Sequence, residues 1–214
     1  MPVPGAATTL VLSQRGDDFE IRVGSHLLMQ SRAHGSEATL AELACAGIAA
    51  GPSPRLLIGG LGMGFTLAAA LRTLPAGALV EVAELVPGLV EWNRGPLADL
   101  AGRPLEDPRV SIREADVADL IRDQRDAYDA ILLDVDNGPQ GLSRPSNDAL
   151  YSSAGLARAH AALRARGVLA VWSVAPDRDF VSRLRKAAFE VEEHVARAHR
   201  SKGGRHIIWI AKRG

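Results

Sequence analysis

The chain has 214 residues, and 47% of them are apolar, enough for the core of one α/β domain with a small appendage. Its 25 basic and 25 acidic residues balance, so the overall charge favours neither nucleic acid nor an anionic membrane as a partner. A single cysteine, Cys45, excludes an internal disulfide, and no Cys/His cluster has the spacing of a metal site.

The chain begins with short β-prone runs. Residues 9–13, 19–23 and 26–29 are separated by polar, glycine-containing turns and predict an antiparallel meander of three strands. We therefore predict an N-terminal β-meander over residues 1–36, which must lean on the rest of the chain or on another subunit because three strands enclose too little core. Ser36 is the predicted N-cap of a helix that runs from residue 37 to about residue 50.

From residue 55 onwards, strand and helix patterns alternate. Strands are predicted from residue 55 and at 79–84, 110–114, 130–134 and 167–173. Helices are predicted at 65–74, from 87, and at 117–122, 153–164 and 177–187, and two further strands at 190–197 and 206–211 close the chain. The alternation predicts an α/β fold over residues 37–214: a doubly wound, mostly parallel, seven-stranded Rossmann-like sheet with an antiparallel edge.

The turn after the first parallel strand is rich in glycine. Four of the six residues from Gly59 to Gly64 carry no side chain, so backbone N–H groups and the next helix N-terminus face an open space. The spacing of Gly60, Gly62 and Gly64 differs from the dinucleotide pattern, which needs a small residue where Phe65 stands. The loop therefore favours a ligand of the S-adenosylmethionine type over NAD. The alternative is a tight turn that binds nothing.

Acidic residues follow the second and third parallel strands. Glu84 lies 24 residues after Gly60, where a carboxylate can accept hydrogen bonds from two ribose hydroxyls. A structural ion pair is the alternative for Glu84. Asp116, next to Ala115, is placed to accept a bond from an adenine amino group, to cap the following helix, or to do both.

The fourth parallel strand ends in two carboxylates, Asp134 and Asp136. They are two residues apart on an extended segment, so both side chains point the same way, into the expected crevice. A carboxylate there can bind an amine and take its proton as the amine attacks a sulfonium carbon. Such a displacement needs positioning and no metal. The alternative is that the pair only caps the loop.

Several short motifs occur in an order and at spacings that are more specific than any one of them. They are Ile58-Gly59-Gly60-Leu61-Gly62-Met63-Gly64, Val82-Ala83-Glu84-Leu85-Val86-Pro87, Glu106-Asp107-Pro108-Arg109-Val110, Ala115-Asp116, Tyr128-Asp129-Ala130-Ile131-Leu132-Leu133-Asp134, Gly138-Pro139 and Leu150-Tyr151-Ser152. This set resembles the spermidine synthase (polyamine aminopropyltransferase) family over about residues 18–175. The resemblance implies a class I methyltransferase-like fold behind an N-terminal β-element, in a protein that is usually a dimer.

The resemblance also implies roles for single residues. It implies Glu84 on the ribose, Asp116 at the adenine, and Asp134 as the carboxylate that handles the amine. Gln30 resembles the family's glutamine before the first helix, which touches the nucleoside. We therefore expect the donor to bind among Gln30, Gly59, Gly60, Leu61, Gly62, Gly64, Glu84, Leu85, Ala115 and Asp116, and catalysis to involve Asp134 and Asp136.

The chain departs from the family at the donor and acceptor positions. Gly62 stands where the family has an aspartate that helps hold the aminopropyl donor. Gly35-Ser36-Glu37 stands where the family has Tyr-His-Glu, and Asn137 replaces the second aspartate of an Asp-x-x-Asp-Pro motif. A loop aspartate would repel the carboxylate of intact S-adenosylmethionine by roughly 1–4 kcal/mol at contact distance. Its loss therefore favours the intact donor and methyl transfer.

We expect a transferase that moves a methyl group, or less readily an aminopropyl group, from S-adenosylmethionine or its decarboxylated form to a small amine or other nucleophile. The alternative is a family member without catalysis that serves as a ligand-binding or dimeric interaction module. The expected partners are a small-molecule acceptor and a second copy of the chain, with no metal, nucleic acid or membrane. The start of the chain lacks a signal-peptide pattern, and no apolar run approaches the roughly 20 residues that span a bilayer, which predicts a cytoplasmic protein.

Two aromatic residues near the expected ligand have open roles. His34 is either a base at the mouth of the site or a structural residue. Trp172, near a strand end, is a candidate for the wall of the acceptor pocket.

Overall fold

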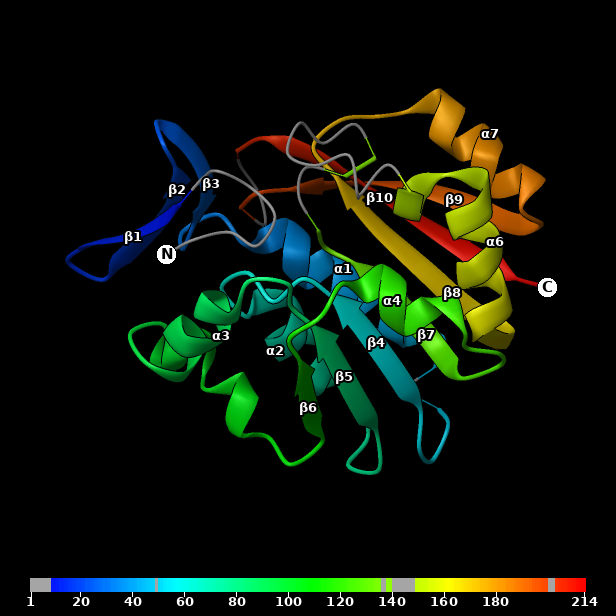
Figure 1. The fold of residues 1–214 in the computed structure, drawn as a ribbon, viewed down its shortest axis with the longest axis horizontal. Coiled ribbons are helices and arrows are strands. Elements are labelled where there is room, and N and C mark those ends of the chain that lie inside the picture. The colour runs from blue at the N-terminus through cyan, green and yellow to red at the C-terminus, as the bar shows by residue number, and fades with distance from the viewer. Residues whose placement is uncertain (1–8, 49, 136–137, 140–148, 200–202) are drawn as a thin grey trace.

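The computed structural model describes residues 9–48, 50–135, 138–139, 149–199 and 203–214. Its N-terminal part is an antiparallel sheet in the order β1-β2-β3, made of β1 (Leu10–Arg15), β2 (Asp18–Val23) and β3 (His26–Gln30). The predicted meander is therefore confirmed. Figure 1 shows this small sheet at one end of the molecule, apart from the chain's C-terminus.

The main sheet has seven strands in the order β6-β5-β4-β7-β8-β10-β9. Strands β6, β5, β4, β7 and β8 run parallel to one another, whereas β10 runs antiparallel to both β8 and β9. This arrangement confirms the predicted doubly wound sheet with an antiparallel edge. The strands are β4 (Arg55–Gly59), β5 (Leu79–Ala83), β6 (Val110–Arg113), β7 (Tyr128–Leu133), β8 (Leu163–Ser173), β9 (Phe189–Arg197) and β10 (Arg205–Arg213).

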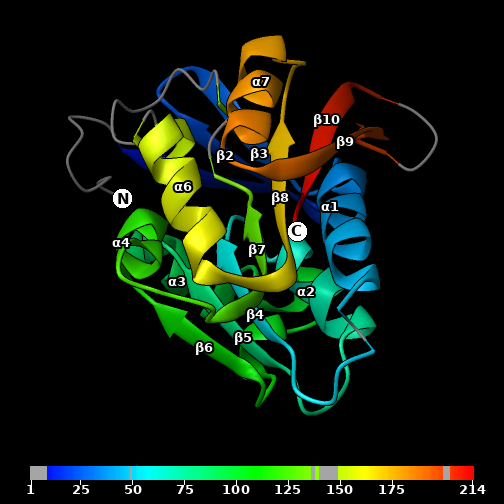
Figure 2. The same ribbon diagram turned by 90° about the vertical axis from the view of Figure 1, so that its right-hand side faces the viewer.

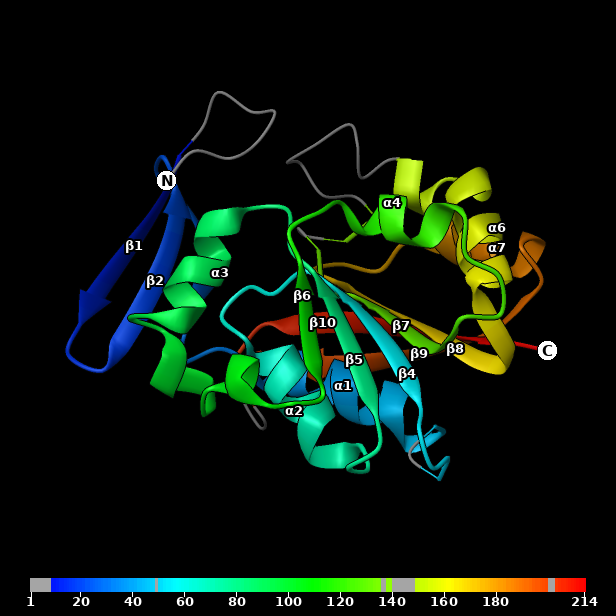
Figure 3. The same cartoon turned by 60° about the horizontal axis from the view of Figure 1, so that its bottom comes forward.

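Helices cover both faces of the main sheet, as Figures 2 and 3 show. Successive side chains of β4 alternate between the faces: Leu56 and Ile58 pack under α1 and α2, whereas Leu57 packs under α4 and α6. None of the described helices is long and apolar enough to cross a membrane. The helices are α1 (Gly35–Ala46), α2 (Phe65–Thr73), α3 (Pro87–Arg94), α4 (Val117–Arg122), α6 (Ser153–Ala162) and α7 (Arg178–Lys186), with 3-10 turns η1 (Ala98–Ala101) and η2 (Pro104–Glu106).

The N-terminal sheet packs on the main body of the same chain. A separate apolar cluster joins Phe19 and Ile21 of β2 to Met63 in the loop after β4 and to Leu89 of α3. Ile21 is fully buried in this cluster. The sheet therefore gains, from its own chain, the core that three strands lack on their own.

Several element boundaries differ from the predicted ones: for example, α1 ends at Ala46 rather than near residue 50, and β7 begins at Tyr128 rather than at residue 130. Helix α1 begins at Gly35, so Ser36 lies inside its first turn and is not the N-cap. Strand β8 begins at Leu163 rather than residue 167, and its register against β7 shifts between Tyr128 and Ala130. The added residues include Arg166 at a φ of 65°. Their helix-forming composition gave no strand signal, and pairing with β7 overrides it.

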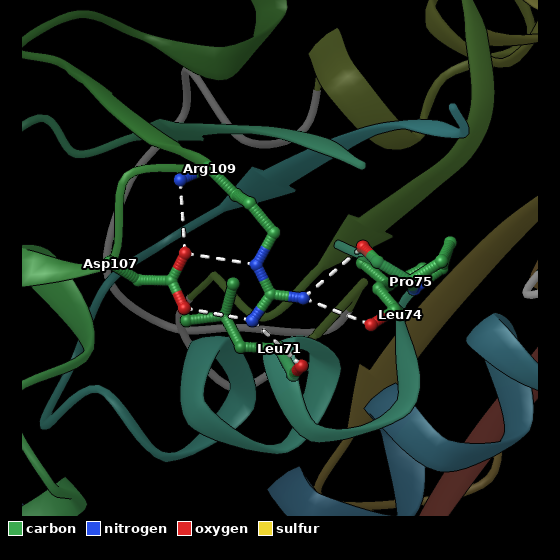
Figure 4. A network of polar contacts seen from close by, with 5 residues as sticks. All are labelled: Leu71, Leu74, Pro75, Asp107 and Arg109. Carbon is green, nitrogen blue, oxygen red and sulfur yellow. Dashed lines mark hydrogen bonds and ion pairs between the residues drawn. The ribbon is translucent and has the colours of Figure 1, made fainter. Parts of the chain in front are cut away.

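Arg109 ties the start of β6 to the C-terminal end of α2, as Figure 4 shows. Its guanidinium donates to the Leu71 carbonyl at 2.9 Å, the Leu74 carbonyl at 2.9 Å and the Pro75 carbonyl at 3.3 Å. It also forms a bidentate pair with Asp107 at 2.9 and 2.8 Å, which holds the pKa of Asp107 below its usual value. The carbonyls at a helix C-terminus otherwise lack partners, so this residue replaces a C-cap.

We predict that Arg109→Lys destabilises the protein by about 2–3 kcal/mol, because an ammonium cannot reproduce the planar fork that serves Asp107 and three carbonyls at once. Urea unfolding at pH 7 measures the change. The matched control is Arg103→Lys, since Arg103 pairs with Asp99 and Glu106 in the exposed η1–η2 region. That control should leave the free energy of unfolding nearly unchanged. Equal losses in the two variants would contradict the capping role of Arg109.

Candidate functional site

The carboxyl ends of the central strands are fastened together by backbone hydrogen bonds. The N–H of Gly60 donates to the Ala83 carbonyl of β5, and the N–H of Asp134 donates to the Gly59 carbonyl of β4, both at 2.9 Å. The N–H of Glu84 likewise reaches the Arg113 carbonyl of β6 at 2.9 Å. The glycine loop, Glu84 and Asp134 therefore meet at the point where the strand order turns from β4 towards β7, which is where open α/β sheets bind ligands.

The glycine loop lies against the backbone of Asp134. Gly60 has a φ of 89°, and a Cβ on it would stand 2.4 Å from the Asp134 carbonyl oxygen. Only glycine fits there, both for its backbone conformation and for its lack of a side chain. The loop is held from the other side by buried Asn93 of α3, whose amide donates to the Gly62 carbonyl at 2.9 Å. No sequence pattern singles out Asn93.

Glu84 is buried, with 5% of its surface exposed, and its carboxylate is held by backbone N–H groups. One oxygen accepts from Leu61 of the glycine loop at 2.9 Å, and the other accepts from Val86 at 2.8 Å. Desolvation raises the pKa of Glu84, while these hydrogen bonds act in the opposite direction. Among the described residues, the groups that act on Glu84 are backbone N–H groups and not basic side chains, so the alternative of a structural ion pair has no support. The residue braces the loop instead.

Asp134 follows β7 and faces the layer formed by α1 and α2. Thr66, in the first turn of α2, donates its hydroxyl to Oδ2 of Asp134 at 2.5 Å. Desolvation, with a smaller effect of the nearby Glu37 carboxyl, raises the pKa of Asp134 to about 7. A carboxyl with such a pKa exchanges a proton near neutral pH, as acid–base catalysis requires.

Glu37 of α1 joins Asp134 in the site, although the sequence assigned it no role. Desolvation also raises the pKa of Glu37, and a hydrogen bond from Ser36 opposes that rise. The only sequence signal was that, of the three residues Gly35-Ser36-Glu37, Glu37 alone matches the Tyr-His-Glu of the resembling family. Its approach to Asp134 depends on how α1 packs on the sheet, which spacing along the chain cannot reveal.

The remaining predicted residues lie around this centre. Asp116 caps α4 by accepting from the Ala118 N–H at 2.8 Å, so the capping role proposed for it is confirmed. Gln30 is exposed at the end of β3, opposite Glu20 of β2. Leu85 and Ala115 are partly buried beside Glu84 and Asp116. Asp136 lies outside the described residues, as does Asn137.

Met29, which the sequence did not single out, is the β3 residue next to the glycine loop. A Cβ on Gly62 would lie 3.4 Å from the Met29 sulfur. Adjacent strand residues face opposite sides, so Met29 points to the buried face and Gln30 to the outer one. An apolar thioether therefore stands next to the position where the resembling family has its aspartate.

The two aromatic candidates occupy different places. His34 is exposed and stacks on Phe65 with 4.1 Å between ring centroids, while its Nδ1 lies 2.9 Å from the Ser31 carbonyl. Trp172 is partly buried and packs its ring edge-on against His206, with 4.7 Å between centroids. Trp172 thus lies on the same side of the sheet as Glu37. Among the described residues, no three His, Cys, Asp or Glu side chains form a group that could hold a metal ion.

Comparisons with solved structures show the same architecture in known enzymes. A spermidine synthase in complex with the transition-state analogue AdoDATO has a TM-score of 0.75 and 18% identity, covering 97% of this chain and 70% of that one. Spermidine synthase from Thermotoga maritima has a TM-score of 0.72 and 18% identity over 95% of this chain and 72% of that one. No family model matches the sequence, and no curated protein matches it either.

A methyltransferase has the same fold at a lower score. The 1,6-didemethyltoxoflavin-N1-methyltransferase of Burkholderia thailandensis, with bound 1,6-didemethyltoxoflavin and S-adenosylhomocysteine, has a TM-score of 0.57 and 24% identity over 83% of this chain and 78% of that one. The chain therefore has the Rossmann-like fold that spermidine synthases share with S-adenosylmethionine-dependent methyltransferases.

We predict that Asp134→Asn stabilises the protein at pH 8 by roughly 3–4 kcal/mol and has little effect on stability near pH 4. The pKa of Asp134 is raised from an unfolded value of roughly 3.9 to about 7, so its stability contribution is fully present below the unfolded pKa and is lost as the pH rises through 7. Asparagine keeps an acceptor for Thr66 and never ionises. Urea unfolding at both pH values measures the difference.

The matched control for this prediction is Asp123→Asn, which changes an exposed carboxylate at the end of α4. Its effect on stability should be small at both pH values. If Asp134→Asn changed stability by the same amount at pH 4 and pH 8, the carboxyl of Asp134 would be an ordinary acid, and its proposed tuning would be wrong.

Proposed function

We propose that this protein is a transferase that binds an S-adenosyl donor across the tips of β4, β5 and β6 and passes the donor's methyl group to a small nucleophile. The observation that carries the proposal is Asp134, whose backbone carbonyl lies against Gly60 of the glycine loop and whose carboxyl, bonded to Thr66, has a pKa of about 7. A carboxyl tuned in this way beside a nucleotide-type loop suits a reaction in which a proton leaves the nucleophile. The bound ligands named for two proteins of the same fold, AdoDATO and S-adenosylhomocysteine, support this choice of donor.

The residues at the strand ends fit an adenosyl group. A carboxylate has about four lone pairs, and Glu84 uses one on each oxygen for Leu61 and Val86. The N–H groups of Leu85 and Gly62 also act on this carboxylate, so two ribose hydroxyls would share its oxygens with backbone donors. We assign the adenine to Ala115 and Asp116, and the rest of the donor to Gly59, Gly60, Leu61, Gly62, Gly64 and Leu85. Gln30 lies on the outer face of β3 and would have to turn towards the loop to touch the nucleoside.

Methyl transfer is favoured over aminopropyl transfer by the neighbourhood of Gly62. Decarboxylated S-adenosylmethionine ends in an ammonium, which a nearby carboxylate would stabilise. Gly62 provides none, and Met29 fills the adjacent space with an apolar side chain. The intact donor carries a carboxylate as well, and the side chain at position 62 adds no negative charge that would repel it.

The chain's part in the reaction is to position the nucleophile and accept its proton. The bound donor supplies a methyl group on a positively charged sulfur, which is already activated for displacement. Asp134 takes the proton on a carboxylate whose Oδ2 is fixed by Thr66. Because its pKa is near 7, this carboxylate is a stronger base than an ordinary aspartate, while a useful fraction stays ionised at neutral pH.

A second candidate function is a non-catalytic member that binds a ligand or forms a dimeric interaction module. Gly35, Ser36 and Gly62 favour it, since they replace the tyrosine, histidine and aspartate of the resembling family. Asp134 and Glu37, however, are two neighbouring carboxyls with raised pKa values, and such a pair suits proton transfer. Methyl transfer to any member of a panel of small amines separates the two functions.

We predict that calorimetry detects S-adenosylmethionine and S-adenosylhomocysteine binding in the micromolar range, and that Gly62→Asp weakens intact S-adenosylmethionine about tenfold or more, or roughly 1.4 kcal/mol. Gly62→Asn is the matched control, because it has the same shape without the charge and both residues tolerate a φ of 53°. The decarboxylated donor should bind Gly62→Asp at least as well as it binds the wild type. Tighter binding of the decarboxylated form to the wild type would overturn the preference for methyl transfer.

We also predict that Asp134→Asn keeps donor affinity within about threefold and lowers methyl transfer by roughly 100-fold or more, because asparagine cannot accept the proton. Radiolabelled methyl transfer to the amine panel measures turnover, and calorimetry measures donor binding. Full activity in Asp134→Asn would remove this residue from the reaction.

A further inference from the structure

Behind Glu37 lies a chain of hydrogen bonds that connects α1 to β10. The Ser36 hydroxyl donates to Oε2 of Glu37 at 2.6 Å, and Nδ1 of His206 lies 2.8 Å from the same hydroxyl oxygen. Ser36 is fully buried, with 0% of its surface exposed. Residues 170 positions apart in the sequence thus form one polar unit inside the apolar layer between α1 and the sheet.

Counting hydrogens shows which residue donates and which accepts in each of these two hydrogen bonds. A serine hydroxyl has one hydrogen, and when Glu37 is ionised that hydrogen is donated to its carboxylate. His206 must then carry its hydrogen on Nδ1 and donate it to the Ser36 oxygen. Burial lowers the pKa of His206, so a neutral imidazole is favoured, and the Trp172 ring packs against it at 4.7 Å. His206 therefore donates to Ser36, and Ser36 donates to Glu37.

We propose that Ser36 and His206 are positioning residues for the proposed reaction: by donating towards Glu37 they keep its carboxylate charged, and that charge makes Asp134 a stronger base. The inference rests on the proposed function for its purpose, because a base is useful only if the nucleophile loses a proton. It gives a role to Ser36, which stands where the resembling family has a histidine. It also gives a role to His206, which lies in β10, the last strand of the chain.

The charges that face each member of the unit support this assignment. Desolvation favours neutral Glu37, and the side-chain group that opposes it is Ser36. Glu37 of α1 and Thr66 of α2 both face Asp134. Desolvation raises the pKa of Asp134 most, and the charge of Glu37 raises it further. The pKa of His206 responds to burial. If the donors were lost, Glu37 would become neutral more readily, and Asp134 would lose the neighbouring negative charge.

The test is a carboxyl ¹³C NMR titration of the ligand-free protein, which needs no knowledge of the acceptor. In the wild type, the Asp134 signal should titrate near pH 7. In Ser36→Ala, the midpoint of Glu37 should rise and that of Asp134 should fall by about half a unit or more. His206→Phe keeps an aromatic ring against Trp172 but removes the donor, and should act in the same direction. His206→Asn, which offers an amide N–H in place of Nδ1–H, should restore most of the wild-type midpoint.

Unchanged Glu37 and Asp134 midpoints in Ser36→Ala and in His206→Phe, both checked for native folding by circular dichroism, would overturn the inference. Equal shifts in His206→Phe and His206→Asn would also overturn it, because packing and not the hydrogen bond would then be responsible. Donor binding by calorimetry keeps the two proposals apart. Shifted midpoints without donor binding would remove the proposed function and leave the hydrogen-bonded unit established.

Discussion

The close approach of Gly60 to the carbonyl of Asp134 is the constraint on which the rest of the site depends. A Cβ at position 60 would stand 2.4 Å from that oxygen, so the loop after β4 can rest on β7 only because the side chain is absent. The same contact sets the separation between the proposed donor loop and the proposed base. Glu84 then holds the loop from the β5 side through Leu61, and Asn93 holds it from α3.

The two carboxyls of the acceptor side owe their chemistry to burial by the helices of one layer. Helices α1 and α2 place Glu37 and Thr66 beside Asp134, and desolvation shifts both acids towards their neutral forms. Buried carboxyls cost stability unless they are hydrogen-bonded. Thr66 and Ser36 provide those hydrogen bonds. The stability that desolvation still costs is typical of functional sites.

The sequence predicted the parts of the site that lie at strand ends, because the pattern of strands alone places Gly60, Glu84 and Asp134 at one edge of a sheet. It could not predict residues that arrive through helix packing or from a distant strand, such as Glu37 and His206. Boundaries failed for related reasons: the Ser36 hydroxyl serves a tertiary contact instead of a helix cap. The motif that contains Arg109 was noted only by resemblance, and the structure gives it a capping role on α2.

The central claim is that an adenosyl group lies across the ends of the first three parallel strands with its sugar on Glu84. A crystal structure grown with S-adenosylhomocysteine tests it most directly. We expect both ribose hydroxyls within hydrogen-bond distance of the Glu84 carboxylate and the thioether near Asp134. A structure in which the protein's own side chains fill that crevice, with the ligand absent or bound elsewhere, would contradict it.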